Sequence, residues 1–254
     1  MEDTLDWRER RRLQTIAQIK ETARRQIATD GAANLSLGAI ARTMGMTPPA
    51  LYRYFENRDA LVAALVVDAY ASMGGALEAA LEDVPTEDHA GRFLALMRAY
   101  RQWAVAYSED YALMAGLPTA AVEMSEAQLV AFQRATLRSM RAMVEVLHAA
   151  YESGCLQIPV PYHQPPPAVG RALAWMQFAL QDESMPVGIL ALALTTWLRA
   201  DGLVWQELHG HLPKALFGEG EFYEMESKVL VERLGLGCGE KGEDEGWESR
   251  GGSG

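Results

Sequence analysis

Cysteine, lysine and long apolar runs are scarce in this sequence of 254 residues. Its two cysteines, Cys155 and Cys238, are too few for a disulfide framework or a cysteine-rich zinc site. No unbroken apolar run reaches the roughly 18 residues of a membrane span. The N-terminal stretch MEDTLDWRERRR also lacks the apolar core of a secretion signal. We therefore expect a cytoplasmic protein without a membrane partner.

Motifs for catalysis and cofactor binding are missing as well. The patterns G-x-S-x-G, H-E-x-x-H and the phosphate loop do not occur. Gly237, Gly239 and Gly242 spell G-x-G-x-x-G, but they lack the preceding strand that a dinucleotide site needs. His209 and His211 lie two residues apart, so on a helix they point about 200° away from each other and cannot easily share a metal. We expect neither an enzyme nor a cofactor or metal site.

Acidic residues outnumber basic ones overall, but the N-terminal end is basic. The formal net charge is −11 at pH 7. Residues 8–58 hold ten Arg or Lys against four acidic residues, a balance of +6, whereas residues 59–254 hold 13 against 27, a balance of −14. Glu2, Asp3 and Asp6 account for the remaining −3. A basic module on an acidic body leaves one end suited to the phosphates of nucleic acid.

Apolar residues recur at helical spacing near the N-terminus, which predicts three helices. The first covers about residues 11–30 and ends before Gly31. Ser36 can cap the second helix, and Thr47 can cap the third, whose first residue is Pro48. A short helix, a turn with glycine and a second helix that begins Thr-Pro are typical of a helix-turn-helix, whose second helix enters the major groove of DNA.

The rest of the sequence also carries helical patterns, with proline or glycine at the breaks and no strand pattern. Asn57 can cap a fourth helix. Further helices are expected at about residues 89–107, 109–116, 125–153, 168–182, 187–211 and 220–234. The predicted fold class is all-α.

The predicted recognition helix, residues 47–54, offers small and polar groups to a DNA groove. The ring of Pro49 and the methyl group of Ala50 suit thymine methyl groups, and Arg53 suits guanine or phosphate. Tyrosine hydroxyls suit phosphate oxygens. The predicted DNA-binding residues are Ser36, Thr47, Pro48, Pro49, Ala50, Tyr52, Arg53, Tyr54 and Arg58. Arginines at positions 8, 10, 11 and 12 are either a solvated charge run or a flexible arm that reaches the DNA backbone or minor groove.

These residues carry a resemblance to a known family. The run SLGAIARTMGMTPPALYRYFENRDALVAALV resembles the DNA-binding signature of TetR-type repressors, with Tyr52 and the aromatic pair Tyr54-Phe55 followed by a basic residue and a leucine. Further on, YRQWAVAYSEDYALMAGLP and TTWLRADGLVWQELHGHLP resemble a branch of that family with a Trp, His, Gly signature. Asp201 stands where that branch usually has the histidine.

The resemblance implies an all-helical homodimer that binds double-stranded, palindromic operator DNA and represses transcription until a small effector releases it. It implies a DNA-binding domain at residues 8–56, a ligand-binding and dimerisation domain at 57–236 and a disordered tail at 237–254. Two alternatives stay open: an activator or ligand-independent regulator on the same fold, and a small-molecule carrier or enzyme that uses the apolar pocket.

Aromatic and methionine side chains in the body are either core or the lining of a pocket for an apolar or aromatic effector. The candidate pocket residues are Met97, Tyr100, Trp103, Tyr107, Met114, Phe132, Met140, Trp175 and Phe178. The family resemblance places the dimer face on the last two long helices. The candidate dimer residues are Leu190, Leu194, Trp197, Leu198, Trp205, Leu208, Val229, Leu230 and Leu234.

Overall fold

The computed structural model describes residues 6–116, 123–210 and 213–237, and all regular secondary structure within these ranges is helical. The predicted all-α class is therefore confirmed. The helices are α1 (Trp7–Asp30), the 3₁₀ turn η1 (Ala32–Asn34), α2 (Leu37–Thr43), α3 (Pro48–Tyr52), α4 (Arg58–Ala79), α5 (His89–Ala106), α6 (Ser108–Gly116), α7 (Glu126–Glu152), α8 (Val160–His163), α9 (Pro167–Leu180), α10 (Val187–His209), α11 (Lys214–Phe217) and α12 (Glu221–Leu234). Apart from Gly237, the predicted disordered tail lies outside the described residues.

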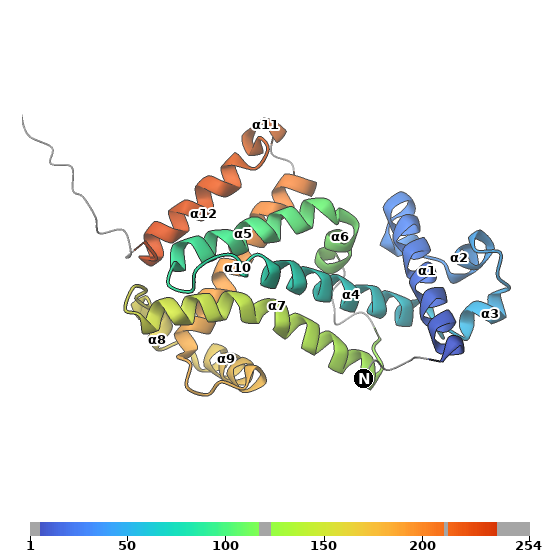
Figure 1. Cartoon of the computed structure of the whole chain (residues 1–254), viewed down its shortest axis with the longest axis horizontal. Helices are drawn as coiled ribbons and strands as arrows, with labels where there is room; N and C mark the ends of the chain where they lie inside the picture. Colours follow the sequence, from blue (N-terminus) through green and yellow to red (C-terminus); the bar gives the residue numbers. More distant parts are fainter. Residues whose placement is uncertain (1–5, 117–122, 211–212, 238–254) are drawn as a thin grey trace, which may run out of the picture.

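Helices α1, α2 and α3 gather at one end of the molecule, and α4 leads from them into an elongated body (Figure 1). Ile19 of α1, Ile40 of α2 and Leu51 of α3 are almost completely buried together with Leu61 of α4. The apolar stripe of each short helix therefore meets a common core, which is how such short helices gain their stability.

Capping residues fix where the short helices begin. The Oγ atom of Ser36 accepts a hydrogen bond from the Ala39 N–H (3.4 Å) at the start of α2. Thr47 occupies the predicted cap position of α3, but its side chain accepts no hydrogen bond. The next two residues are prolines, which have no N–H to donate. The Ala50 N–H instead bonds to the Thr47 carbonyl oxygen (2.9 Å).

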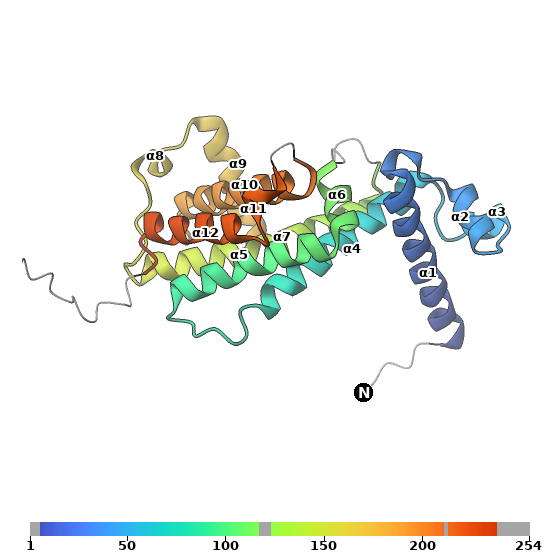
Figure 2. The same cartoon turned by 90° about the horizontal axis from the view of Figure 1, so that it is seen from above.

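The body is a bundle in which α4, α5 and α7 lie side by side, α10 packs across α5 and α7, and α12 packs on α5 (Figure 1 and Figure 2). Its core contains fully buried Phe93, Met97, Leu147 and Ile189, one or more from each of three helices. The single-turn helices α8 and α11 were not predicted. Each follows a proline, and one turn is too short to show an apolar period.

Two helices of the bundle are, by length and composition, apolar enough to cross a membrane: α4 and α10. The sequence contains no unbroken apolar run of that length because charged residues interrupt both helices, yet the charges are few. Half of the apolar window in each helix is buried inside the protein. Helices at the centre of a water-soluble bundle have this same composition.

Candidate DNA-binding surface and effector core

The start of α3 presents the predicted base-reading residues to solvent. Its exposed residues, including the cap position and the residue that follows the helix, are Thr47, Pro48, Pro49, Tyr52 and Arg53. Leu51 and Phe55 are buried and fix the helix on the core, while Ala50 and Tyr54 are half-buried. Helix α3 ends at Tyr52, two residues earlier than predicted. Small residues at its start allow the backbone to approach base edges closely.

Two predicted phosphate contacts have other partners within the chain. Arg58 donates from Nη2 to the Ala32 carbonyl oxygen (2.7 Å) and from Nη1 to Asp59 (3.1 Å), so its guanidinium joins η1 to the start of α4. This interaction argues against the predicted phosphate role of Arg58. The Tyr54 ring lies 5.8 Å from the guanidinium of Arg12 and packs against the core of the three-helix unit.

The arginines near the N-terminus belong to α1 and are not a flexible arm. Helix α1 begins at Trp7, so Arg8, Arg10, Arg11 and Arg12 occupy its first turns, and all four are exposed. The Arg11 guanidinium lies over the Trp7 ring at 5.4 Å. Arginine has high helix propensity. The arginines therefore extend α1 toward the N-terminus, beyond the apolar pattern from which its start was predicted.

Charge pairing distinguishes these arginines from several arginines of the body. Arg98, Arg101, Arg138 and Arg199 each form an ion pair with a glutamate. Within the described residues, by contrast, no ion pair involves the cations around the recognition helix: Arg8, Arg10, Arg11, Arg12, Arg42 and Arg53. Arg42, exposed on the last turn of α2, was not predicted as a contact because it lies outside the recognition helix. Unpaired cations on one surface attract an extended anion.

The body brings together some of the predicted pocket residues but not others. Met97, Tyr100 and Trp103 are buried, and Met114, Phe132 and Met140 are half-buried. Tyr107 (51% exposed), Trp175 (56%) and Phe178 (69%) point to solvent, so their assignment to an interior pocket is wrong. Helix α9 instead buries Leu173 and Leu180 in the core. This helix has apolar residues on more than one side, so periodicity alone did not predict which side is buried.

The interior cavity is small. It measures about 10 Å³, roughly the space of one water molecule. Its lining comes from α4, α5, α7 and α10: Leu77, Leu96, Met97, Tyr100, Met143, Trp197 and Ala200. Trp197, which was predicted to lie in a dimer face, thus lines the interior. An effector that enters must displace the flexible methionines or the aromatic rings.

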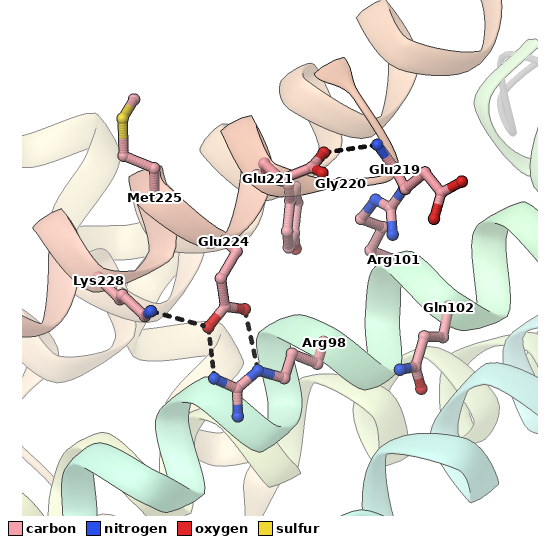
Figure 3. Close-up of a pocket in the computed structure, with 10 residues that line it drawn as sticks. Arg98, Arg101, Gln102, Glu219, Gly220, Glu221, Glu224, Met225 and Lys228 are labelled. Atoms are coloured by element: carbon pink, nitrogen blue, oxygen red, sulfur yellow. Dashed lines mark hydrogen bonds and ion pairs between the residues drawn. The ribbon is translucent and has the colours of Figure 1, made fainter.

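A larger groove of about 620 Å³ lies on the surface between α5 and α12 (Figure 3). Arg98 donates from Nε to Glu224 (2.9 Å), which also lies 3.7 Å from Lys228. Arg101 donates from Nε to Glu207 (2.8 Å). The cations of this groove are thus already neutralised, so it is a brace between helices rather than an anion site.

A polar cluster borders the interior cavity. The hydroxyls of Tyr100 and Tyr111 both donate to Oδ1 of Asp201, at 2.8 and 3.0 Å. Burial, followed by the negative charge of Asp201, raises the pKa of both tyrosines, so they remain protonated donors. Tyr111 was not among the predicted residues, because its partner lies 90 residues away in the sequence.

Asp110, the residue before Tyr111, forms a hydrogen bond with α1 in the DNA-binding end of the chain. Arg24 of α1 donates from Nε to Asp110 (2.8 Å), and Lys20 donates to Asp68 of α4 (2.8 Å). Asp110 is buried; burial raises its pKa, and the bond from Arg24 partly offsets this effect. Helix α6 thus contacts α10 through Tyr111 and α1 through Asp110.

The predicted dimer residues divide by burial. Leu190 and Leu230 are buried in the core of the chain itself, which excludes them from a surface. Leu198 is 60% exposed and Trp205 is 37% exposed, both on α10. The other predicted dimer residues are half-buried: Leu194, Trp197, Leu208, Val229 and Leu234.

Comparison with known proteins places both ends of the chain in one family. Residues 19–65 match the family described as "Bacterial regulatory proteins, tetR family", and residues 93–226 match "Tetracyclin repressor-like, C-terminal domain". The HTH-type transcriptional regulators Rv1816 of Mycobacterium tuberculosis H37Rv and Mb1846 of Mycobacterium bovis are 42% identical over 107 residues, which is 42% of this chain and 46% of each relative. The chain thus spans about half the length of these curated relatives.

Solved structures agree with the sequence families. The regulatory protein SCO4313 is 33% identical, with 88% of this chain and 98% of that one covered and a TM-score of 0.68. A tetR-family regulatory protein from Rhodococcus RHA1 is 14% identical, with 87% and 96% covered and a TM-score of 0.59, which shows the same fold. The finer resemblance to the Trp, His, Gly branch stays a prediction. The chain belongs to the TetR family of bacterial regulatory proteins, and α2 and α3 form its helix-turn-helix.

Proposed function

We propose that the protein is a cytoplasmic repressor that binds a palindromic operator as a homodimer and is released by a small, mostly apolar effector. Residues 8–56 bind DNA, and residues 57–236 bind the effector and form the dimer. The observation that carries the proposal is the grouping of unpaired arginines around the exposed start of α3, on a chain in which Arg98, Arg101, Arg138 and Arg199 of the body pair with glutamates.

At the DNA, the first turn of α3 selects the sequence and its surroundings hold the backbone. Pro49, Ala50 and Arg53 contact base edges, and Tyr52 donates its hydroxyl to phosphate. Ser36, Thr47, Pro48 and Tyr54 complete the surface. The acidic body is repelled by phosphate, which leaves this end as the docking surface.

The dimer supplies the second half of the recognition site. One recognition helix of this length reads too few base pairs for useful specificity, whereas two copies about one helical turn of DNA apart, roughly 34 Å, read a palindrome. The exposed apolar side chains Leu198 and Trp205 on α10 support a partner on that face.

Helix α6 is the route by which we propose that the effector weakens DNA binding. Tyr111 on its inner side is bonded to Asp201 of α10, and Asp110 on its outer side is bonded to Arg24 of α1. An effector that spreads the core displaces α6, and α6 then shifts α1 with the recognition helix. Such coupling between sites typically amounts to about 1–3 kcal/mol, and it requires that the effector bind one arrangement more tightly than the other.

The test uses the full chain and the DNA upstream of its own gene. Footprinting should reveal a protected palindrome, sedimentation should show a dimer, and a reporter behind that promoter should be expressed less when the protein is present. Higher reporter expression would point to an activator on the same fold. A monomer, or a protein that protects no palindrome in dilute buffer, would contradict the proposal.

A further inference from the structure

Among the described residues, Asp201 is the half-buried carboxylate with no arginine, lysine or histidine nitrogen within 4 Å. Across the described residues, the carboxylates that are buried or half-buried are Asp59, Asp68, Asp110, Asp182, Asp201, Glu207, Glu224 and Glu226. All but Asp201 lie within 4 Å of a described arginine, lysine or histidine nitrogen. Asp201 is held only by the two tyrosine hydroxyls. A charge that leaves water is normally compensated by a partner of opposite sign.

The surroundings of Asp201 are aromatic. The Tyr100 ring lies 4.7 Å from the Trp197 ring and 6.5 Å from the Tyr111 ring. On the other side, Tyr111 lies 6.4 Å from Trp205, which stacks on His209 at 4.4 Å. The faces of aromatic rings are negative, so a cation that lies over one of these rings gains attraction beside that of the carboxylate.

From this juxtaposition we propose that the effector site takes an organic cation, a quaternary or protonated amine on an apolar body, whose charge is held by Asp201. The inference rests on the proposed effector-responsive function and names the chemical class of the effector. The apolar body extends into the cavity beside Ala200, where Met97 and Met143 can move aside.

A metal ion fits this place poorly. The described residues contain no group of three or more histidines, cysteines or carboxylates that could hold one. Calcium and magnesium need six or more oxygen ligands, and this site offers one carboxylate whose Oδ1 already accepts two hydrogen bonds. Aromatic rings and methionine thioethers instead suit a large, weakly hydrated cation.

The binding experiment compares two ligands of one shape. Benzyltrimethylammonium carries a positive charge, and neopentylbenzene has the same outline without it. Calorimetry and tryptophan fluorescence with the purified chain should detect saturable binding of the cation at least tenfold tighter than that of the neutral molecule. Asp201→Asn should remove that preference, whereas Tyr111→Phe, which keeps the charge, should retain it. No saturable binding of the cation, or an unchanged preference in Asp201→Asn, overturns the proposal.

Thermal unfolding without a ligand gives a second, independent readout. Asp201→Asn keeps an oxygen for both tyrosines and removes an uncompensated charge, so its Tm should equal or exceed that of the natural protein. The matched control is Glu226→Gln, which leaves Arg199 without its partner and should lower Tm. A fall in Tm for Asp201→Asn as large as in the control would make Asp201 a structural anchor and overturn the proposal.

Operator binding separates this inference from the function on which it rests. The natural protein is therefore also titrated with its operator DNA. If the natural protein binds its operator but not the cation, the cation site is wrong and the regulator stands. If it binds the cation at Asp201 but no DNA, the proposed function fails and the site stands.

Discussion

Neighbouring residues in the recognition segment have different surroundings, and this gives them different tasks. Arg53 is exposed and forms no ion pair with described residues, so its guanidinium is available to donate hydrogen bonds to base edges. Tyr54, the next residue, is half-buried between the core and the Arg12 guanidinium. A residue anchored in this way positions the helix and can offer only its hydroxyl to a phosphate.

Arg53→Ala should therefore change sequence preference, whereas Tyr54→Ala should weaken binding to all sequences about equally. Removal of a bidentate bond to a base costs about 1–3 kcal/mol on the preferred operator and little on other DNA. Titration of both variants against the operator and single-base variants of it measures the difference. An equal decrease in affinity on every sequence from both substitutions would contradict this division of tasks.

Cap residues show how local sequence sets helix ends. Asn57 accepts a hydrogen bond from the Ala60 N–H (2.7 Å) at the start of α4, while the Thr47 side chain accepts none. The two look equivalent in sequence, since Ser, Thr, Asn and Asp are all favoured caps. The equivalent donor after Thr47, the Ala50 N–H, bonds to the Thr47 carbonyl oxygen instead of its side chain.

Asn57→Ala should destabilise the protein by about 1 kcal/mol, the usual contribution of a cap. Thr47→Ala should change the free energy of unfolding far less, because the threonine side chain makes no capping bond. Urea unfolding of the two variants, with the natural protein alongside, provides the comparison. Similar destabilisation by both would mean that Thr47 stabilises the fold by some means other than capping.

At the scale of whole elements, α12 is held on α5 by the ion pair between Arg98 and Glu224 at the groove of Figure 3. The hydrogen bond from Arg98 keeps the pKa of Glu224 below its ordinary value of 4.5. A lowered folded-state pKa means that the ionised form stabilises the fold. The contribution is full above the unfolded-state pKa and disappears as the pH falls through the lowered folded-state pKa.

Glu224→Gln should consequently lower Tm near neutral pH and show a smaller further decrease below about pH 4.5, where the natural protein loses the same interaction. The exposed neighbour Glu232 supplies the control substitution Glu232→Gln on the same helix. Thermal melts from pH 7 to pH 3 test the prediction. Parallel curves for the natural protein and Glu224→Gln would show that the ion pair does not brace α12.

Helices longer than three turns, the caps Ser36 and Asn57 and the recognition segment could be predicted from sequence because they depend on residues within one turn of each other. The inner side of α9, the burial of Leu190 and the Tyr111–Asp201 hydrogen bond could not. These depend on which helices meet, and their partners lie far apart along the chain. The resemblance to a family gave the architecture, but not the side chains that line its core.

For the molecule as a whole, the distribution of charge decides how it meets DNA. The basic first turns of α1 lie beside the recognition segment, as the proximity of Arg12 to the Tyr54 ring shows. Arg8, Arg10 and Arg11 precede Arg12 in the first turns of α1, are exposed and have no ion pair within the described residues. If α1 lies along the DNA backbone, each arginine that holds a phosphate releases counterions on binding.

Replacement of Arg8, Arg10 and Arg11 by alanine should therefore reduce the slope of log affinity against log salt concentration by about 0.9 for each phosphate that is no longer neutralised, with sequence preference unchanged. The matched control replaces Arg134 and Arg171, exposed arginines of the body. Affinity is measured on the operator from low to moderate salt. An unchanged slope in the α1 variant would mean that these arginines are only solvated, because a cation that holds no phosphate releases no counterion.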